Sequence, residues 1–259
     1  MADGHDAWAP GEIARRVDEV GVAKARADAL TTLTLAVLAG AFISLGAMFC
    51  TVVLADGGSR LAGGLVFCLG LILVVVAGAE LFTGNNLIAM AWASKHIRTR
   101  DVLRNWLLVY VGNVVGCLGT AMLVWVAGTQ TLLEGAVGAK AIAIAGSKAQ
   151  LGWGVAFARG ILCNALVCLA VWLCLGGRSV TDKILAILFP ITAFVVLGFE
   201  HSIANWYFLS YAMLVLHEMD ATFVEGAARN LVAVTAGNIV GGTMLVAGVY
   251  WLAYLRNEA

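Results

Sequence analysis

The sequence predicts an all-α membrane protein with six transmembrane segments, the second and fifth of them broken. Three observations indicate this class. Of the 259 residues, 61% are hydrophobic and only 12% are charged, roughly half the charged share of a soluble domain. Long apolar runs recur along the chain, and two of them contain a polar interruption. Sixteen basic and sixteen acidic residues cancel, so net charge gives no reason to expect a nucleic-acid partner.

Six apolar runs are candidate membrane segments, because a bilayer core needs about 20 apolar residues per helix. They lie near 30–55, 61–93, 105–128, 151–176, 183–216 and 230–255. The second and fifth, at 33 and 34 residues, are too long for one straight span. Polar interruptions at 77–86 and 198–205 divide them. We expect each to form two half-helices joined by a loop at membrane depth.

The runs define one channel domain at 30–255, preceded by an N-terminal segment at 1–29 and followed by a short tail at 256–259. The N-terminal segment predicts an amphipathic helix that begins at Pro10. This helix is either an interfacial or gating element or a solvated lead into the first span.

The distribution of Lys and Arg predicts that both termini are cytoplasmic, by the positive-inside rule. Eleven basic residues then lie inside: Arg15, Arg16, Lys24, Arg26, Lys95, Arg98, Arg100, Arg104, Arg178, Lys183 and Arg256. Four lie outside: Arg60, Lys140, Lys148 and Arg229. Arg159 falls within the fourth span, where we expect it to reach the outer interface or a protomer contact rather than a pore.

The two halves of the chain match each other. GAELFTGN at 78–85 and GFEHSIAN at 198–205 share the pattern G-x-E-x4-N, 120 residues apart. The third and sixth spans share N-x6-GN-x-VG, at 105–116 and 230–241, 125 residues apart. Three spans per copy is an odd number, so the copies must cross the membrane in opposite directions. This predicts an inverted 3+3 repeat, whose interrupted segments mark the transport site.

The first and fourth spans match less well, although Gly40 and Gly160 are also 120 residues apart.

Ionisable side chains at membrane depth should face the protein interior. Glu80 and Glu200 recur at equivalent positions, which favours a role in supporting the loops. His201 has Leu81 as its counterpart, so the repeat does not require it. Because an imidazole exchanges protons near neutral pH, we interpret His201 as functional.

The remainder of the interruption is apolar up to Thr83. Leu81 and Phe82 precede Thr83, and the flanking half-helices contribute Phe67, Leu71 and Phe194. A narrow apolar constriction opposes a bare charge but tolerates a small neutral molecule. One titratable donor beside it suggests a solute that is either neutral or anionic, such as a weak monobasic acid.

AELFTGNN, GRSVTDK and GFEHSIAN, on six spans with two broken, closely resemble the formate/nitrite transporter family over most of 30–255. The stretch from ILCNALVCLAVW to GFEHSIAN is most similar to the formate channels of that family. The resemblance implies an aquaporin-like fold, a homopentamer with one pore per protomer, and a bacterial inner-membrane location. It implies no cofactor.

The resemblance also implies site residues. The gating loop of the family matches Leu81, Phe82 and Thr83, and its central histidine, which faces the threonine, matches His201. The other implied residues are Phe67, Leu71, Val167 and Phe194 at the constriction, Asn164 at the pore, Lys148 in a vestibule, and Glu200 with Asn205 as supports.

The expected cargo is a small monovalent weak-acid anion. Formate ranks first because of the regional similarity, nitrite second and hydrosulfide third. We expect flux to depend on pH, with channel-like and proton-coupled transport both open.

Two other classes fit less well. A channel for water or glycerol normally carries Asn-Pro-Ala at both half-helix starts, and neither interruption contains proline. A zinc protease needs HExxH, but after His217-Glu218 position 221 is alanine. The six cysteines lie in apolar runs without metal-ligand spacing. The sequence therefore predicts neither an enzyme nor a metal site.

Overall fold

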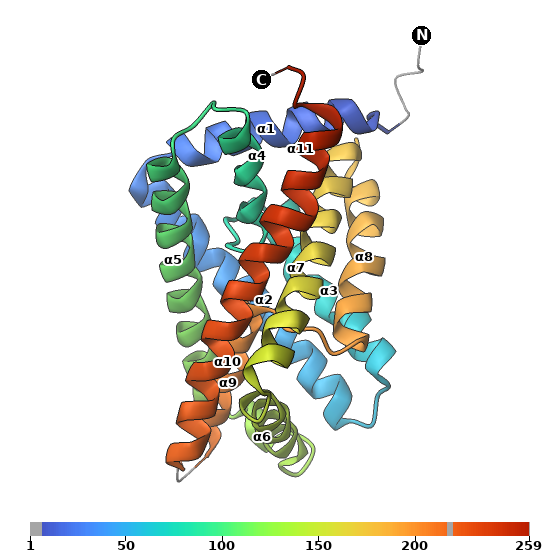
Figure 1. Cartoon of the computed structure of the whole chain (residues 1–259). Helices are drawn as coiled ribbons and strands as arrows, with labels where there is room; N and C mark the ends of the chain where they lie inside the picture. Colours follow the sequence, from blue (N-terminus) through green and yellow to red (C-terminus); the bar gives the residue numbers. More distant parts are fainter. Residues whose placement is uncertain (1–6, 217–219, 259) are drawn as a thin grey trace.

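The computed structural model describes residues 7–216 and 220–258, and within these ranges every regular element is a helix. His217 and Glu218 lie outside the described residues. Long helices stand side by side, and α1 lies across the end at which α11 terminates (Figure 1). The elements are α1 (Pro10–Arg26), α2 (Ala29–Ala55), α3 (Arg60–Val76), η1 (Gly84–Ile88), α4 (Ala89–Ala93), α5 (Thr99–Val126), η2 (Thr129–Thr131), α6 (Ala136–Ala149), α7 (Trp153–Gly176), α8 (Val180–Val196), α9 (Ser202–Val215), α10 (Ala221–Val240), η3 (Gly241–Gly248) and α11 (Val249–Tyr254).

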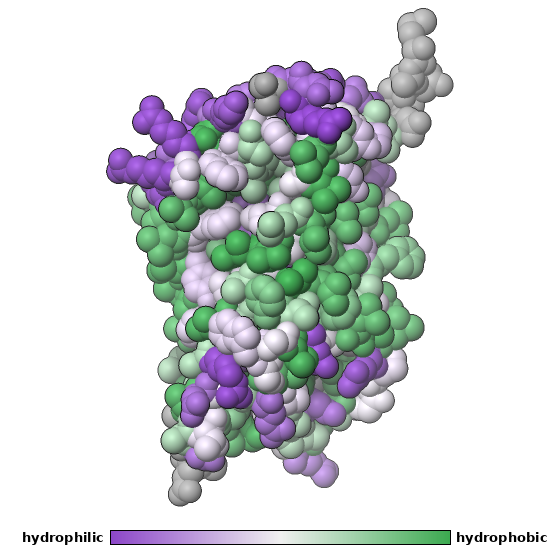
Figure 2. Space-filling view, in the orientation of Figure 1, coloured by the Kyte–Doolittle hydropathy of each residue, from purple (hydrophilic) through white to green (hydrophobic). Residues whose placement is uncertain are grey.

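Within the described residues, four helices are long and apolar enough to cross a membrane: Ala29–Ala55, Thr99–Val126, Trp153–Gly176 and Ala221–Tyr254. The last comprises α10, the π-helical η3 and α11. Arg60–Val76 is a shorter apolar helix. On the face seen in Figure 2, hydrophobic residues form a broad band, and hydrophilic residues gather toward the two ends. This is the surface that a bilayer requires.

Both predicted interruptions are places where helical structure stops. α3 ends at Val76 and α8 at Val196, and Gly78 and Gly198 follow with φ of +80° and +70°. Glycine adopts this left-handed backbone without steric cost. The predicted interruption at 198–205 is too long, because α9 already begins at Ser202.

His201 explains the early restart of the helix, since its side chain accepts a hydrogen bond from Ala204 N–H as the N-cap of α9.

Close packing between long helices depends on glycines. A Cβ built on Gly116 of α5 would lie 2.1 Å from the carbonyl oxygen of Val37 in α2, and one on Gly241 would lie 2.1 Å from that of Ile161 in α7. Backbones therefore touch at these two crossings, as small residues permit in membrane helices.

Hydrogen bonds from two asparagines indicate which residue of α7 corresponds to which residue of α2. The Asn113 carboxamide donates to the Ala36 carbonyl, and that of Asn238 donates to the Gly160 carbonyl. Gly160 is thus equivalent to Ala36, and the predicted pairing of Gly40 with Gly160 is wrong by one helical turn.

Helix α1 is packed against the bundle rather than solvated. Ile13, Ala14 and Val17 are buried. Trp8 lies between the guanidinium groups of Arg16 and Arg178, 3.7 and 3.9 Å from its ring centroid. One face of α1 therefore packs against the bundle, and the other face is exposed.

The chain turns sharply between α1 and α2. Asp28 is the N-cap of α2, and the hydrogen bond from the Thr31 N–H lowers the pKa of its carboxyl. This cap fixes where α2 begins. α1 ends just before it, with Lys24 in its last turn.

We predict that Gly116→Ala destabilises the protein by about 1–3 kcal/mol, because its methyl group would overlap the α2 backbone. Gly119→Ala on the same helix is the control, since a Cβ there meets nothing within 4 Å. Thermal unfolding of the detergent-solubilised protein measures both. Equal melting temperatures for the two variants would contradict the packing argument.

Candidate functional site

Three cavities follow one another through the bundle. The α1-side cavity, about 330 Å³, is lined by Lys24, Leu35, Glu80 and Asn85 among others. The α6-side cavity, about 410 Å³, is lined by Arg60, Lys148, Arg159 and Glu200 among others. Between them lies a central cavity of about 10 Å³. Its lining consists of Ile43, Phe67, Leu71, Leu81, Val167, Ile191, Phe194 and His201.

Neighbouring cavities share walls. Leu71 and Leu81 line both the α1-side and the central cavity. Phe67, Phe194 and His201 line both the central and the α6-side cavity. The central space has about the volume of one water molecule. The row is therefore a path with two mainly apolar constrictions, and His201 is the polar group at the second.

The hydrogen bonds of His201 fix its tautomer. Its Nδ1 accepts from Ala204 N–H at 3.1 Å, and its Nε2 lies 3.0 Å from Thr83 Oγ1. A neutral imidazole that accepts at Nδ1 carries its proton on Nε2. Nε2–H then donates to Thr83 Oγ1. Thr83 itself is fully buried and lines none of the three cavities, although it was predicted at the pore. Protonation of Nδ1 would break the cap of α9.

Two asparagine carboxamides hold the loops. Asn113 Oδ1 accepts from Phe82 N–H at 2.9 Å, and its Nδ2 donates to the Glu80 carbonyl at 2.9 Å. Asn238 Oδ1 accepts from Ser202 N–H at 2.9 Å, and its Nδ2 donates to the Glu200 carbonyl at 3.0 Å. Both asparagines are fully buried. The loops thus have partners that lipid cannot supply.

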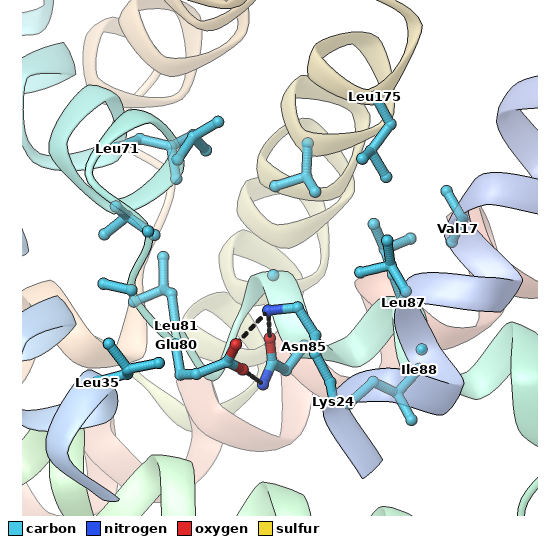
Figure 3. A pocket seen from close by; sticks show the side chains of 18 residues that line it. Val17, Lys24, Leu35, Leu71, Glu80, Leu81, Asn85, Leu87, Ile88 and Leu175 are labelled. Atoms are coloured by element: carbon cyan, nitrogen blue, oxygen red, sulfur yellow. Dashed lines mark hydrogen bonds and ion pairs between the residues drawn. The ribbon is translucent and has the colours of Figure 1, made fainter. Parts of the chain in front are cut away.

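A Lys-Glu-Asn cluster borders each large cavity. Lys148 Nζ lies 3.0 and 3.1 Å from the two carboxylate oxygens of Glu200, and Asn205 Nδ2 donates to Glu200 at 2.7 Å. On the other side, Lys24 Nζ donates to Glu80 at 2.8 Å and to Asn85 at 2.9 Å, as Figure 3 shows.

Sequence reasoning missed Lys24 as a site residue. It lies 124 residues before Lys148, an offset that would have indicated it had α1 been counted in the repeat.

Most predicted constriction residues converge. Phe67, Leu71, Leu81, Val167, Phe194 and His201 all line the central cavity. Ile43 and Ile191 line it too, and no sequence signal distinguished them from other apolar helix residues. Phe82 lines none of the three cavities, since its ring packs 4.9 Å from that of Tyr110.

Asn164 also lines none of the three cavities. It is fully buried and donates to the carbonyls of Thr83 and Asn238 and to Asn86 Oδ1. Its carboxamide thereby links the Thr83 loop to α10.

Arg159 lies where it was not expected. It lines the α6-side cavity with Lys148 and Glu200, whereas the sequence favoured the outer interface or a protomer contact over a pore role. In the described part of the chain, no three His, Cys, Asp or Glu side chains gather as metal ligands.

Comparisons with known proteins agree with this geometry. The family model described as formate/nitrite transporter matches residues 11–252. The formate channel FocA of Escherichia coli K12 is 38% identical over 98% of this chain and 96% of its own length. A probable formate transporter of Methanothermobacter thermautotrophicus is 36% identical over 95% and 97%.

Solved structures are similar as well. A chain titled "FNT family ion channel" superposes with a TM-score of 0.86 at 29% identity, covering 93% of this chain and 98% of its own. A "pentameric formate channel with formate bound" gives a TM-score of 0.80 at 38% identity, covering 88% and 98%. Since the family model and these relatives match nearly the whole length, the chain belongs to the formate/nitrite transporter family.

Proposed function

We propose that this protein is a homopentameric, pH-dependent channel for formate in the bacterial inner membrane, with nitrite and hydrosulfide as alternative cargoes. The observation that carries this proposal is the row of three cavities that narrows to about 10 Å³ beside His201. Relatives named as formate channels, and the pentameric neighbour with formate bound, support the cargo and the assembly.

The proposed architecture has six membrane segments: α2, α3 with α4, α5, α7, α8 with α9, and α10 through α11. We propose that they form two inverted copies in an aquaporin-like arrangement. The matched carboxamide contacts of Asn113 and Asn238 support the repeat. The excess of Lys and Arg at the α1 end supports a cytoplasmic position for both termini.

The central cavity sets the form in which the solute crosses. A bare anion in an apolar space pays a desolvation cost far above that of a neutral acid. Formate therefore takes up a proton from the solvent before it enters the central cavity, crosses as formic acid, and releases the proton to the solvent on the other side. In the central cavity the hydrogen-bonded pair of Thr83 and His201, of which His201 lines the cavity, supplies the hydrogen bond that replaces a lost bond to water.

Charge in the α6-side cavity favours the approach of the anion. Lys148 lies there, its side chain 12% exposed, and the cavity opens toward the proposed outer face. A positive cavity raises the local concentration of anions. Acidification then increases flux, because a larger fraction of the solute is in the neutral form.

We predict that Thr83→Val lowers formate flux by about tenfold, since one hydrogen bond to a desolvated solute is lost while side-chain volume is kept. His201→Ala should lower flux as well, because the Thr83 hydroxyl would lose the N–H group that polarises it. Stopped-flow assays in proteoliposomes at an acidic and a neutral pH measure both variants. If His201→Ala carried formate with the wild-type rate and pH profile, the role of His201 would be wrong.

We predict that Glu200→Gln destabilises the protein by about 3–5 kcal/mol, because Lys148 would stay buried without its counter-ion. The control is Glu258→Gln in the exposed pair with Arg15, whose side chains are 46% and 56% exposed. That variant should have the same melting temperature as the wild type. Thermal unfolding in detergent measures both, and a wild-type melting temperature for Glu200→Gln would exclude a stabilising ion pair.

The same vesicles separate the cargoes. Wild-type flux of formate, nitrite and hydrosulfide is compared at matched concentration, and glycerol-driven swelling tests the neutral-solute alternative. Formate should be fastest. Glycerol permeation without anion flux would overturn the proposal.

A further inference from the structure

The two large cavities differ in charge. Among the described residues, Lys24 and Glu80 are the charged side chains that line the α1-side cavity, so its formal charge is zero. The α6-side cavity is lined by Arg60, Lys148, Arg159 and Glu200, three basic groups and one acid, for a formal charge of +2. The difference in formal charge between the two cavities therefore comes from Arg60 and Arg159.

Lys148 already interacts with a carboxylate and an aromatic ring of the protein. Its Nζ lies 3.0 and 3.1 Å from both carboxylate oxygens of Glu200, and 5.3 Å from the centroid of the Phe208 ring. An anion that binds Lys148 must compete with a carboxylate held in place by Asn205. Lys148 thus contributes less net attraction than its charge suggests.

The backbone of Arg159, but not its side chain, makes a hydrogen bond to the loop that contains Glu200. Its carbonyl accepts from Glu200 N–H at 3.2 Å, as the carbonyl of Leu35 accepts from Glu80 N–H at 3.2 Å. The repeat therefore needs only the carbonyl, and leucine meets that need in the first copy. Within residues 7–216 and 220–258, the Arg159 guanidinium has no ion pair or hydrogen bond.

The guanidinium lies at the bend that leads to Glu200 and His201. A Cβ built on Gly198 would be 4.0 Å from Arg159 Nη1. Arg159 and His201 line the same cavity, and His201 also lines the central one. An anion held by Arg159 would therefore lie one constriction away from the central cavity.

We propose that Arg159 is an anion-capture site that favours anions with two oxygens over hydrosulfide, an inference that rests on the proposed anion transport. A planar guanidinium donates two parallel hydrogen bonds to the O–C–O of a carboxylate or the O–N–O of nitrite. Hydrosulfide has a single sulfur atom, so it cannot accept the two parallel hydrogen bonds at two separate acceptor atoms. Arg159 thereby sets specificity in the outer vestibule before the solute is desolvated.

The test compares Arg159→Gln, Arg159→Lys and the control Arg60→Gln, which removes a charge from an exposed position in the same cavity. Half-saturating concentrations for formate, nitrite and hydrosulfide are measured in proteoliposomes. Arg159→Gln should raise the values for formate and nitrite about tenfold and that for hydrosulfide by less than about threefold. For formate and nitrite, the half-saturating concentration of Arg159→Lys should lie between those of Arg159→Gln and the wild type. Lysine keeps the positive charge but lacks the two parallel N–H donors of the guanidinium.

A binding measurement separates this inference from the proposed function. Saturation-transfer NMR on the formate proton, with the purified full-length protein, should show a signal that Arg159→Gln weakens more strongly than Arg60→Gln, because Arg60 contributes charge to the cavity from an exposed position. No formate flux in the wild type would overturn the proposed function. The assignment of Arg159 would be overturned if Arg159→Gln transported and bound formate as the wild type does. It would also be overturned if Arg60→Gln changed transport and binding as much as Arg159→Gln.

Discussion

The carboxamides of Asn113 and Asn238 make the hydrogen bonds on which the rest of the site depends. Each accepts from one loop N–H and donates to a loop carbonyl and to a carbonyl of a long helix. Lipid offers no substitute for these bonds, so a break in a helix at membrane depth needs protein partners. Without them neither the Thr83 loop nor His201 would hold its position at the central cavity.

The residues to which we assign functions lie where the two matched segments of the sequence differ. His201 stands in the second copy where Leu81 stands in the first, and Arg159 stands where Leu35 does. In each case the backbone serves the fold in both copies, while the side chain is free to vary. The path is consequently symmetric in its backbone contacts but asymmetric in its chemistry, with one imidazole at the centre and excess positive charge on the α6 side.

The amino-acid pattern alone predicted much of this protein. Hydropathy predicted an all-helical membrane chain, because twenty apolar residues have few other stable environments. The spacing of GAELFTGN and GFEHSIAN located both interruptions. It also identified His201 as the residue that the repeat does not require. Such features are local in sequence or recur at a constant offset, so they can be read without knowledge of packing.

Other features depend on contacts between distant segments. Phe82 was expected at the pore, yet its ring packs on Tyr110, because successive loop residues point in different directions. Lys24 reaches Glu80 only because α1 folds across the end of the bundle.

The sequence by itself determined the helical class, the family resemblance and the repeated loop. Only the tertiary structure decided that Arg159 faces a cavity and that Ile43 and Ile191 complete the constriction. On a uniformly apolar helix, hydropathy does not distinguish the lipid-facing side from the pore-facing side. That choice is made by helix packing, which depends on residues far apart in the chain.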